Sequence, residues 1–362
     1  MIFHDSHEFF IPEKVNGFHT GANGFKLHCE IIELHLKHTW TIARGSSDSK
    51  KNVFVTIEKD DVTGYGEAAP NIRYDETAES CAAVIERARP LFQTHDPWHI
   101  VDFCAAIQRL DAGQSAAKAA LDMALLDWIT KSLELPLFKY FGLDKNKTPV
   151  TTYSIGIDTP EMIQQKIQEA EDYPIYKIKV GLEKDAEIIQ AVRSVSDKPL
   201  RVDANEGWQS KEEALEKIRW LQTQNVELIE QPLPAAMLAE TRWLRERVQI
   251  PIIADESVKK ASDIANLATA FDGINIKIMK SGGLQEALRM IWVAKSLGMS
   301  VMLGCMVESS LAISAAASLS PLVDFADLDG NLLIKNDPFA GIQVRDGKIM
   351  LVDKSGLGAQ PR

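Results

Sequence analysis

Apolar and polar residues follow two different patterns along the chain of 362 residues. In the first part, alternation with a period of two predicts half-buried strands, and apolar residues at helical spacing predict helices after them. The strands are expected at 27–36 and 52–59, and the helices at 77–92, 99–110 and 115–133. Strands followed by helices favour an α+β domain. We predict this domain over residues 1–147, of which residues 1–25 form an irregular segment without an assigned function.

From residue 148 onward, short apolar strands alternate with amphipathic helices. Polar residues mark the expected C-terminal ends of eight strands, at intervals of 22 to 27 residues. These residues are Thr152, Lys177, Asp203, Glu230, Asp255, Lys280, Cys305 and Asp327. Eight such units are typical of a (β/α) barrel, whereas a doubly wound sheet would carry a Gly-rich phosphate loop after its first strand. We therefore predict the α/β class, with a modified, TIM-like (β/α) barrel at 148–339, an N-terminal capping domain, and a segment at 340–362 that returns to the cap.

The composition narrows the choice of partner. Asp and Glu number 51 against 40 Lys and Arg, so the formal charge is −11, and no basic cluster favours nucleic acid or an anionic membrane. The four cysteines are scattered, which disfavours a disulfide framework or a zinc site. Neither a signal peptide nor an apolar run of about 18 residues is found, so a cytoplasmic protein is expected. The acidic excess is compatible with carboxylates around a divalent cation.

Charged residues stand where the barrel strands are expected to end, and a barrel of this kind places its active site at that rim. Three i, i+2 pairs occur there, and residues two apart on a strand point to the same side. The pairs are Lys177 and Lys179, Asp203 and Asn205, and Asp327 and Asp329. A solvated loop position explains one such charge, but not the same feature on six strands. We therefore expect these side chains to share one pocket.

Three consecutive strands each supply one carboxylate to this rim, from Asp203, Glu230 and Asp255. Three neighbouring carboxylates repel one another unless a cation lies between them. Because the candidate ligands are oxygens only, Mg²⁺ is favoured over zinc. Salt bridges to the nearby lysines are the alternative. Asn205 could bind either a ligand carboxylate or a substrate oxygen.

The lysines stand on two opposite walls of the expected barrel, Lys177 and Lys179 on one and Lys280 on the other. Two opposed bases suit a 1,1-proton transfer, in which one group removes a proton from carbon and the other returns a proton to the opposite face. A lysine acts as a base only when its pKa falls well below about 10.4. A metal would stabilise the enolate that forms next to a carboxylate.

The segments KIK, DAN, IEQP, ADES and KIMKSGG, in this order, resemble the enolase superfamily and within it the muconate-lactonizing subgroup. The resemblance spans about residues 26–358, including GYGEAAP in the capping domain and GLG near the C-terminus. It implies that Asp203, Glu230 and Asp255 bind Mg²⁺. It also implies that Lys179 and Lys280 form the acid/base pair and that Lys177 steadies the substrate carboxylate.

Members of this subgroup catalyse muconate cycloisomerization, o-succinylbenzoate synthesis, N-acylamino-acid racemization or dipeptide epimerization. The segment Asp327-Leu-Asp329 is similar to the dipeptide epimerases, in which the two carboxylates hold the α-ammonium group of the N-terminal residue. The resemblance implies further substrate contacts by Cys305, by the backbone of Val307 and, more weakly, by Ser154 and Thr152 on the first strand. We therefore expect a Mg²⁺-dependent isomerase that epimerises the C-terminal residue of a dipeptide.

An o-succinylbenzoate synthase or an N-acylamino-acid racemase is the enzymatic alternative, and a barrel that only binds peptides is the non-catalytic one. One departure from the family bears on specificity: Arg44 is one position out of step with the basic residue that pairs glutamate in Ala-Glu-preferring relatives. Trp40 and Ile42 would line an apolar pocket instead. We expect Ala-Xaa dipeptides with a hydrophobic second residue, with Ala-Glu as the alternative. A homo-oligomer is left open.

Overall fold

The computed structural model describes residues 24–362. The predicted irregular segment therefore lies almost wholly outside the described residues. Within them, no helix has the length and apolar character needed to cross a membrane.

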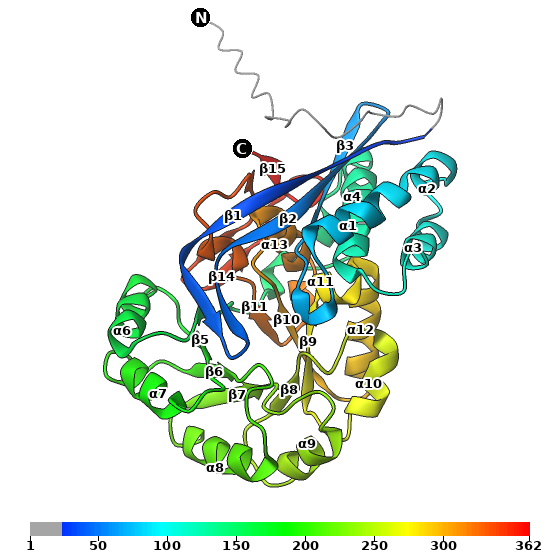
Figure 1. Ribbon diagram of the computed structural model, residues 1–362. Coiled ribbons are helices and arrows are strands. Elements are labelled where there is room, and N and C mark those ends of the chain that lie inside the picture. Colours follow the sequence, from blue (N-terminus) through cyan, green and yellow to red (C-terminus); the bar gives the residue numbers. More distant parts are fainter. Residues whose placement is uncertain (1–23) are drawn as a thin grey trace, which may run out of the picture.

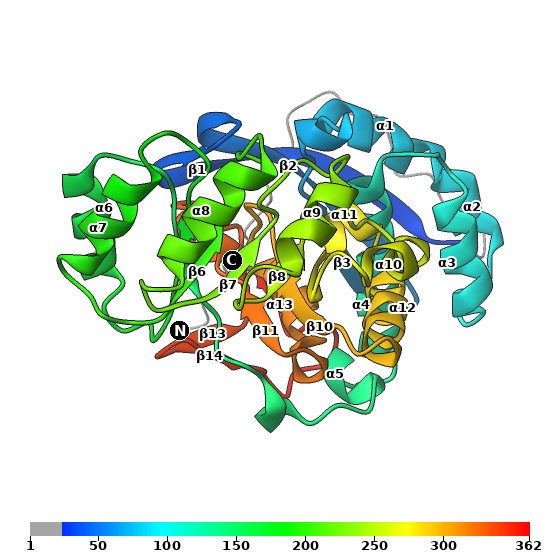
Figure 2. The same cartoon turned by 90° about the horizontal axis from the view of Figure 1, so that it is seen from below.

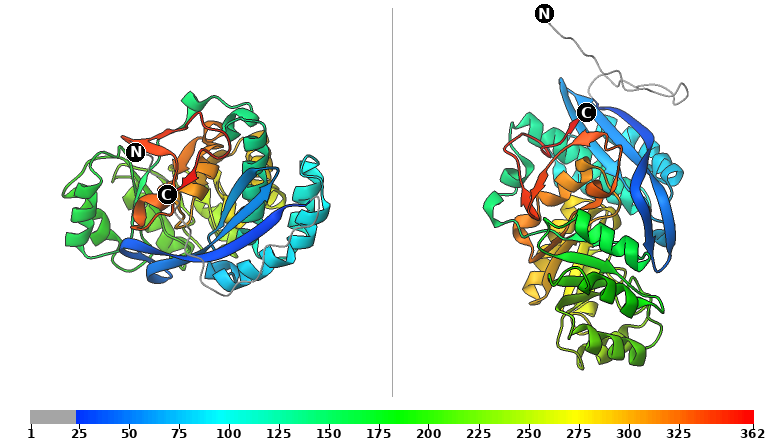
Figure 3. Two further views of the ribbon diagram at one scale, coloured as in Figure 1. Left: turned by 90° about the horizontal axis from the view of Figure 1, so that it is seen from above. Right: turned by 90° about the vertical axis from the view of Figure 1, so that its left-hand side faces the viewer.

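The capping domain begins with an antiparallel three-stranded sheet of β1 (Lys26–Ile42), β2 (Gly45–Lys59) and β3 (Val62–Ala68). Val53, Val55 and Ile57 of β2 are buried, as the apolar alternation predicts, and Asn52 and Phe54 on the other face are buried as well. Both β1 and β2 are longer than predicted, because the polar segment 37–51 continues as a two-stranded ribbon that reaches toward the barrel (Figures 1 and 3). This segment lacks the apolar alternation on which the prediction depended. The ribbon carries Trp40, Ile42 and Arg44 to the barrel rim.

The helices of the capping domain follow in the order that the sequence predicts. They are α1 (Ala78–Arg87), α2 (Arg89–Thr94), α3 (Ile100–Gln108), α4 (Ser115–Ser132) and α5 (Leu137–Tyr140), with short 3₁₀ turns η1 (Ile72–Tyr74) and η2 (Lys145–Lys147). Of these, α1, α2 and α4 pack on this sheet. The predicted helix at 77–92 is divided because Pro90 starts a second helix. Helix α4 is buried almost all round and packs on β3, where Gly66 lies so close to the Ala120 carbonyl that a Cβ atom would clash.

Eight parallel strands in sequential order form the barrel, as predicted. They are β4 (Tyr153–Ile155), β5 (Tyr176–Lys179), β6 (Leu200–Asp203), β7 (Val226–Glu230), β8 (Ile252–Ala254), β9 (Gly273–Lys277), β10 (Ser300–Gly304) and β11 (Phe325–Asp327). A bridge between Thr151 and Ala326 joins the first strand to the last. The predicted fold, a (β/α) barrel behind an N-terminal α+β domain, is therefore confirmed.

Helices surround these strands on the outside of the barrel (Figure 2). They are α6 (Pro160–Glu169), α7 (Asp185–Arg193), α8 (Lys211–Leu221), α9 (Leu238–Arg245), α10 (Ala261–Leu267), α12 (Leu284–Ser296) and α13 (Ser310–Ala317), with the one-turn α11 (Ile278–Ser281) after β9 and the 3₁₀ turn η3 (Ser320–Leu322) after α13. The last strand is followed by a 3₁₀ turn, η4 (Gly330–Leu333), where an eighth helix would stand in a regular barrel.

Two predicted strand ends are wrong: Thr152 precedes β4 instead of ending it, and Lys280 lies beyond the end of β9. Strand β9 ends at Lys277, and Lys280 lies in the single turn of α11 that follows. The chain leaves the barrel wall as soon as the apolar run GINIK is complete, so the fourth residue of KIMK no longer belongs to the strand.

The C-terminal segment contains two small antiparallel pairs, β12 (Phe339–Ala340) with β15 (Gln360–Pro361), and β13 (Gln343–Arg345) with β14 (Lys348–Met350). Its final turn contacts the capping domain: the Leu357 N–H donates to Asp127 of α4 at 2.9 Å, and the Leu137 N–H donates to the Gly356 carbonyl at 2.8 Å. These contacts hold the end of the chain against the cap helices.

Candidate active site

A cavity of about 200 Å³ lies at the C-terminal ends of the barrel strands and is lined by both domains. The barrel contributes Ser154, Lys177, Lys179, Asn205, Lys277, Cys305, Met306, Val307, Asp327, Asp329 and Leu333. The cap contributes Trp40, Ile42, Arg44, Lys50, Asn52, Ala69, Pro70, Asn71 and Ile72. The barrel rim thus supplies most of the charge, and the β1–β2 ribbon closes the cavity from the other side.

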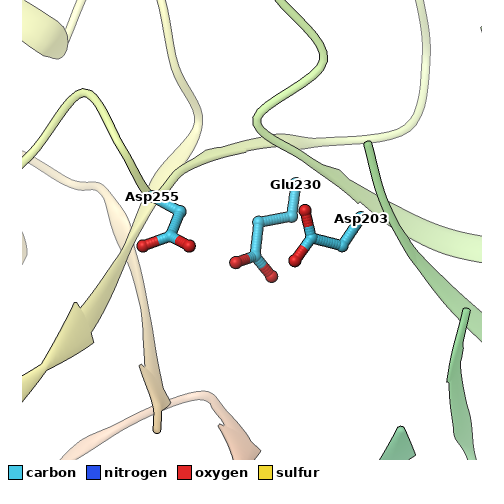
Figure 4. A group of neighbouring side chains, drawn as sticks. All are labelled: Asp203, Glu230 and Asp255. Carbon is cyan, nitrogen blue, oxygen red and sulfur yellow. The ribbon is translucent and has the colours of Figure 1, made fainter. Parts of the chain in front are cut away.

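The three predicted metal ligands come together at the end of consecutive strands. Asp203 ends β6 and is in register with Glu230, which ends β7, while Asp255 follows β8. One carboxylate oxygen from each lies within 4.8 Å of the others, and all three side chains are buried (Figure 4). The parallel strands bring these carboxylates to one edge, which the spacing along the chain predicted.

This group suits a divalent cation. Burial, and then the neighbouring Asp203 carboxylate, raise the pKa of Glu230 to about 7. No residue in the described part of the chain donates a hydrogen bond to Glu230 Oε2, although Lys177 Nζ lies 2.8 Å away. A buried carboxylate oxygen without a hydrogen bond, next to two further carboxylates, is an unfavourable arrangement that a bound cation relieves. Oxygen ligands alone fit Mg²⁺.

Lysines from β5 lie directly beside this group. Lys177 Nζ is 3.2 Å from Asp203, 2.8 Å from Glu230 and 2.6 Å from Asp327, and Lys179 Nζ is 2.6 Å from Asp203. These are the salt bridges that the sequence left open as an alternative. Burial alone would lower the pKa of Lys177, but the three carboxylates outweigh it and raise that pKa well above its ordinary value. Lys177 is therefore a fixed positive charge.

The opposite wall carries a lysine that the sequence reasoning missed. Lys277, at the end of β9, lines the cavity and lies 2.8 Å from Asp255. Strands β5 and β9 are four apart in a barrel of eight, so Lys277 faces Lys179 across the pore. Lys280 also contacts Asp255, at 2.5 Å, but its side chain is completely buried and does not line the cavity. The signal that could have found Lys277 was its place directly after Ile276, the last apolar residue of β9.

The predicted substrate-contact residues on the first and last strands also meet. Asp327 accepts hydrogen bonds from the hydroxyls of Thr152, at 2.6 Å, and Ser154, at 3.1 Å. The Ser154 N–H donates to Asp329 at 2.5 Å, and Cys305 Sγ is 4.0 Å from that carboxylate. Burial, and then the Asp327 carboxylate, raise the pKa of Asp329 to about 7. A cationic group between these carboxylates would offset their repulsion.

The capping domain holds the loop after β10. Asn52 of β2 donates to the Val307 carbonyl at 3.0 Å and to Glu67 of β3 at 2.8 Å. Glu67 also accepts from the Ser309 N–H and hydroxyl and from the Ala312 N–H, at the N-terminus of α13. Sequence reasoning missed this connection, although Glu67 belongs to the GYGEAAP segment that it singled out.

Arg44 lines the cavity but is bound to protein groups. Its Nη1 atom lies 2.7 Å from Glu256 and donates to the Asn205 carbonyl at 2.9 Å. Asn205 adopts a positive φ of 46°, donates from its backbone to Asp203 at 2.9 Å and from its side chain to Glu256 at 3.2 Å. Arg44 therefore connects the ribbon to the loops that follow β6 and β8.

Fold and site together define a capped (β/α)-barrel protein with a carboxylate group suited to a divalent cation. Two family models match the chain: the mandelate racemase / muconate lactonizing enzyme N-terminal domain over residues 29–142, and the enolase C-terminal domain-like model over residues 161–362. The chain therefore belongs to the enolase superfamily, as its resemblance predicted.

Relatives named as epimerases align with most of the chain. An L-Ala-D/L-Glu epimerase of Bacteroides thetaiotaomicron is 46% identical over 90% of this chain and 85% of its own length. A hydrophobic dipeptide epimerase of Enterococcus faecalis is 33% identical over 92% of this chain and 98% of its own. Among solved structures, a Cytophaga hutchinsonii dipeptide epimerase with Mg and D-Ala-L-Val has a TM-score of 0.88 at 30% identity, over 93% of this chain and 95% of that one.

Proposed function

We propose that this protein is a Mg²⁺-dependent dipeptide epimerase, an isomerase that inverts the α-carbon of the C-terminal residue. The observation that carries the proposal is the combination, in one cavity, of opposed lysines with the Asp327–Asp329 carboxylate pair. Relatives named for this activity, at 46% and 33% identity, support it. A cytoplasmic location belongs to the same proposal and rests on the sequence alone.

Asp203, Glu230 and Asp255 would hold the Mg²⁺ ion. When bound, Mg²⁺ stabilises the negative charge that develops when a proton is removed next to a carboxylate. Lys177 binds and orients the same substrate carboxylate, because its charge is fixed and its ammonium group lies within 3.2 Å of two of these ligands.

Lys179 and Lys277 form the acid/base pair, with Lys277 in the role that the sequence prediction gave to Lys280. One lysine, in its neutral form, takes the α-proton, and the other, in its protonated form, returns a proton to the opposite face. One C–H bond breaks and another forms, so the net change is inversion. Asp255 raises the pKa of Lys277 although burial opposes it, so Lys277 keeps its proton as long as this carboxylate is not otherwise engaged.

Asp327 and Asp329 bind the α-ammonium group of the N-terminal residue. Two carboxylates are needed there because a buried cation without anionic partners is strongly unfavourable. Ser154 and Thr152 keep Asp327 oriented through their hydroxyl groups. The Val307 backbone and Cys305 line the cavity beside this pair, and Asn205 borders it on the side of the metal ligands.

The test is exchange of the α-proton in D₂O. A panel of L-Ala-L-Xaa dipeptides with Mg²⁺ should show deuterium at the second residue, followed by the appearance of the L,D epimer. Asp329→Asn should reduce exchange with dipeptides and spare an N-acylated amino acid, which has no ammonium group. Turnover of N-acylated substrates or of an o-succinylbenzoate precursor, without exchange in any dipeptide, would favour the alternative enzymes instead.

A further inference from the structure

One basic side chain in the cavity differs from the others. Five basic residues of the described part of the chain line it, and four of them have a carboxylate within 2.6 to 2.8 Å. The pairs are Lys177 with Asp327, Lys179 with Asp203, Lys277 with Asp255, and Arg44 with Glu256. Within residues 24–362, the ammonium group of Lys50 has no ion pair and no hydrogen bond. It is a positive charge still available to a ligand.

Lys50 is presented to the cavity by a fixed strand. It lies two residues before Asn52 on β2, so both side chains leave the strand on the same face. Asn52 is buried and held by Glu67 and the Val307 carbonyl, which fixes this part of the strand. Lys51, between them, points to the other face, is exposed, and does not line the cavity.

The position is an unfavourable one for an unpaired ammonium group. Burial lowers the pKa of Lys50, because the charge loses part of its hydration and gains no anion in return. An apolar side chain such as methionine would fill the same space without this cost. An anion that arrives with the ligand would offset it.

We propose that Lys50 is a specificity-determining residue whose ammonium group binds a carboxylate on a side chain of the dipeptide. The inference rests on the proposed epimerase function and makes acidic dipeptides such as L-Ala-L-Glu the favoured substrates, in place of the hydrophobic ones expected from the sequence. In the proposed function, the α-carboxylate of the substrate is already bound by Lys177 and by the Mg²⁺ ion that Asp203, Glu230 and Asp255 would hold. Arg44, the earlier candidate for this contact, is occupied by Glu256 and the Asn205 carbonyl. Trp40 and Ile42 then pack on the aliphatic part of the side chain.

The experiment compares matched charged and neutral substrates. Epimerization of L-Ala-L-Glu, L-Ala-L-Gln, L-Glu-L-Ala and L-Gln-L-Ala is measured with Mg²⁺ for the wild type, Lys50→Met and the control Lys51→Met. In Lys50→Met, kcat/KM for one acidic dipeptide should fall by about 10- to 100-fold, the usual effect of losing a charge-assisted hydrogen bond. The neutral counterpart should change by less than about threefold, and Lys51→Met should leave all four rates unchanged. The dipeptide that is affected identifies which residue carries the carboxylate.

The outcomes separate this inference from the function on which it rests. If Lys50→Met slows charged and neutral substrates equally, or slows none, Lys50 does not bind a side-chain carboxylate and the inference is overturned while the epimerase assignment stands. If the wild type exchanges the α-proton of no dipeptide in a broad panel, the assignment and the inference fall together.

Discussion

Asp255 accepts hydrogen bonds from two lysines three residues apart, and only one of them faces the cavity. At the scale of single residues, this difference decides which lysine can reach a substrate. Lys277 stands on the strand, where its side chain points into the barrel, and Lys280 stands on the helical turn behind Asp255. Lys280 also donates to the Asp255 carbonyl at 2.5 Å, which suits a residue that positions the metal ligand.

Variants of Lys277 and Lys280 distinguish the roles of these two lysines. Lys277→Ala should reduce α-proton exchange by about 10²- to 10⁴-fold, the usual effect of losing a general acid or base. Lys280→Met keeps the buried volume and should stay within about tenfold of the wild type, because the side chain does not reach the cavity. Exchange is followed by NMR in D₂O with Mg²⁺. The reverse order of effects would restore Lys280 as the acid/base residue.

Glu308 supplies a prediction about pH. Its side chain is fully buried, its Oε1 accepts from the Met306 N–H at 2.7 Å, and burial raises its pKa to about 8. The folded protein therefore retains a proton that the unfolded chain loses near pH 4.5. The resulting stability is complete below the unfolded pKa and is lost as pH rises toward 8, by up to about 1.4 kcal/mol per pH unit.

The Glu308→Gln variant has an amide in place of the carboxyl group, so it releases no proton at this position between pH 5.5 and 8.5. Its free energy of unfolding, measured in urea between pH 5.5 and 8.5, should fall less steeply with pH than that of the wild type. Glu212→Gln, at an exposed carboxylate, serves as the control and should follow the wild-type slope. Parallel curves for Glu308→Gln and the wild type would mean that Glu308 is ionised in the folded protein.

At the scale of elements, the most informative contact is the one between β3 and α13. Glu67 is a residue of the cap sheet, yet it satisfies N–H groups at the N-terminus of a barrel helix. Such N–H groups need an acceptor, and a carboxylate also interacts favourably with the positive end of the helix dipole. Because Asn52 joins Glu67 to the Val307 carbonyl, the same contact fixes one wall of the cavity.

Removing this acceptor should affect both stability and binding. Glu67→Ala leaves several buried donors unpaired and should lower the free energy of unfolding by at least about 2 kcal/mol. It should also raise KM, since the loop that carries Val307 loses its support. Urea unfolding and steady-state kinetics measure the two effects, with the partly exposed Glu58→Ala on β2 as the control. Wild-type stability and KM would exclude a supporting role for Glu67.

At the scale of the whole molecule, the cavity exists only between the two domains. The barrel contributes the carboxylates and the lysines, whereas the cap contributes Lys50, Asn52 and the aromatic and aliphatic wall. Arg44 and Arg73 reinforce the junction, since both contact Glu206, which follows β6. A substrate bound there would touch both domains, so binding and the docking of the cap are coupled.

Mg²⁺ should stabilise the folded protein, because the carboxylates of Asp203, Glu230 and Asp255 come together in the folded barrel. A cation that binds only the folded state adds about 2.7 kcal/mol when its concentration is a hundred times its dissociation constant. Differential scanning calorimetry should show a higher unfolding temperature with Mg²⁺, reversed by EDTA. Glu230→Gln should lose most of this shift, and the exposed Glu246→Gln should keep it. An equal shift in both variants would place the cation elsewhere.

Much of the fold and part of the site could be predicted because both depend on regular strand geometry. Parallel strands of similar spacing end at one rim, so the carboxylates at 203, 230 and 255 had to meet once the barrel formed. The ribbon at 37–51 could not be predicted from its polar sequence. Its two strands pair with each other, and contacts with the barrel, such as the ion pair of Arg44 with Glu256, stabilise them. Lys277 and Lys280 are three residues apart, a spacing compatible with a strand end or with a helical turn. The sequence therefore did not show which of the two faces the cavity.

The sequence by itself determined the order of strands and helices, the barrel, the carboxylate group and the Asp327–Asp329 pair, since each follows from a local period and from where a strand ends. The tertiary structure alone decided that Lys277 faces the cavity and that Arg44 is bound by Glu256. It also decided that Lys50 has no ion pair or hydrogen bond within residues 24–362. The physical reason is that the period of apolar and polar residues specifies which face of a helix or strand a residue occupies. Which distant group meets that residue depends on how the two domains pack, and specificity is determined at that level.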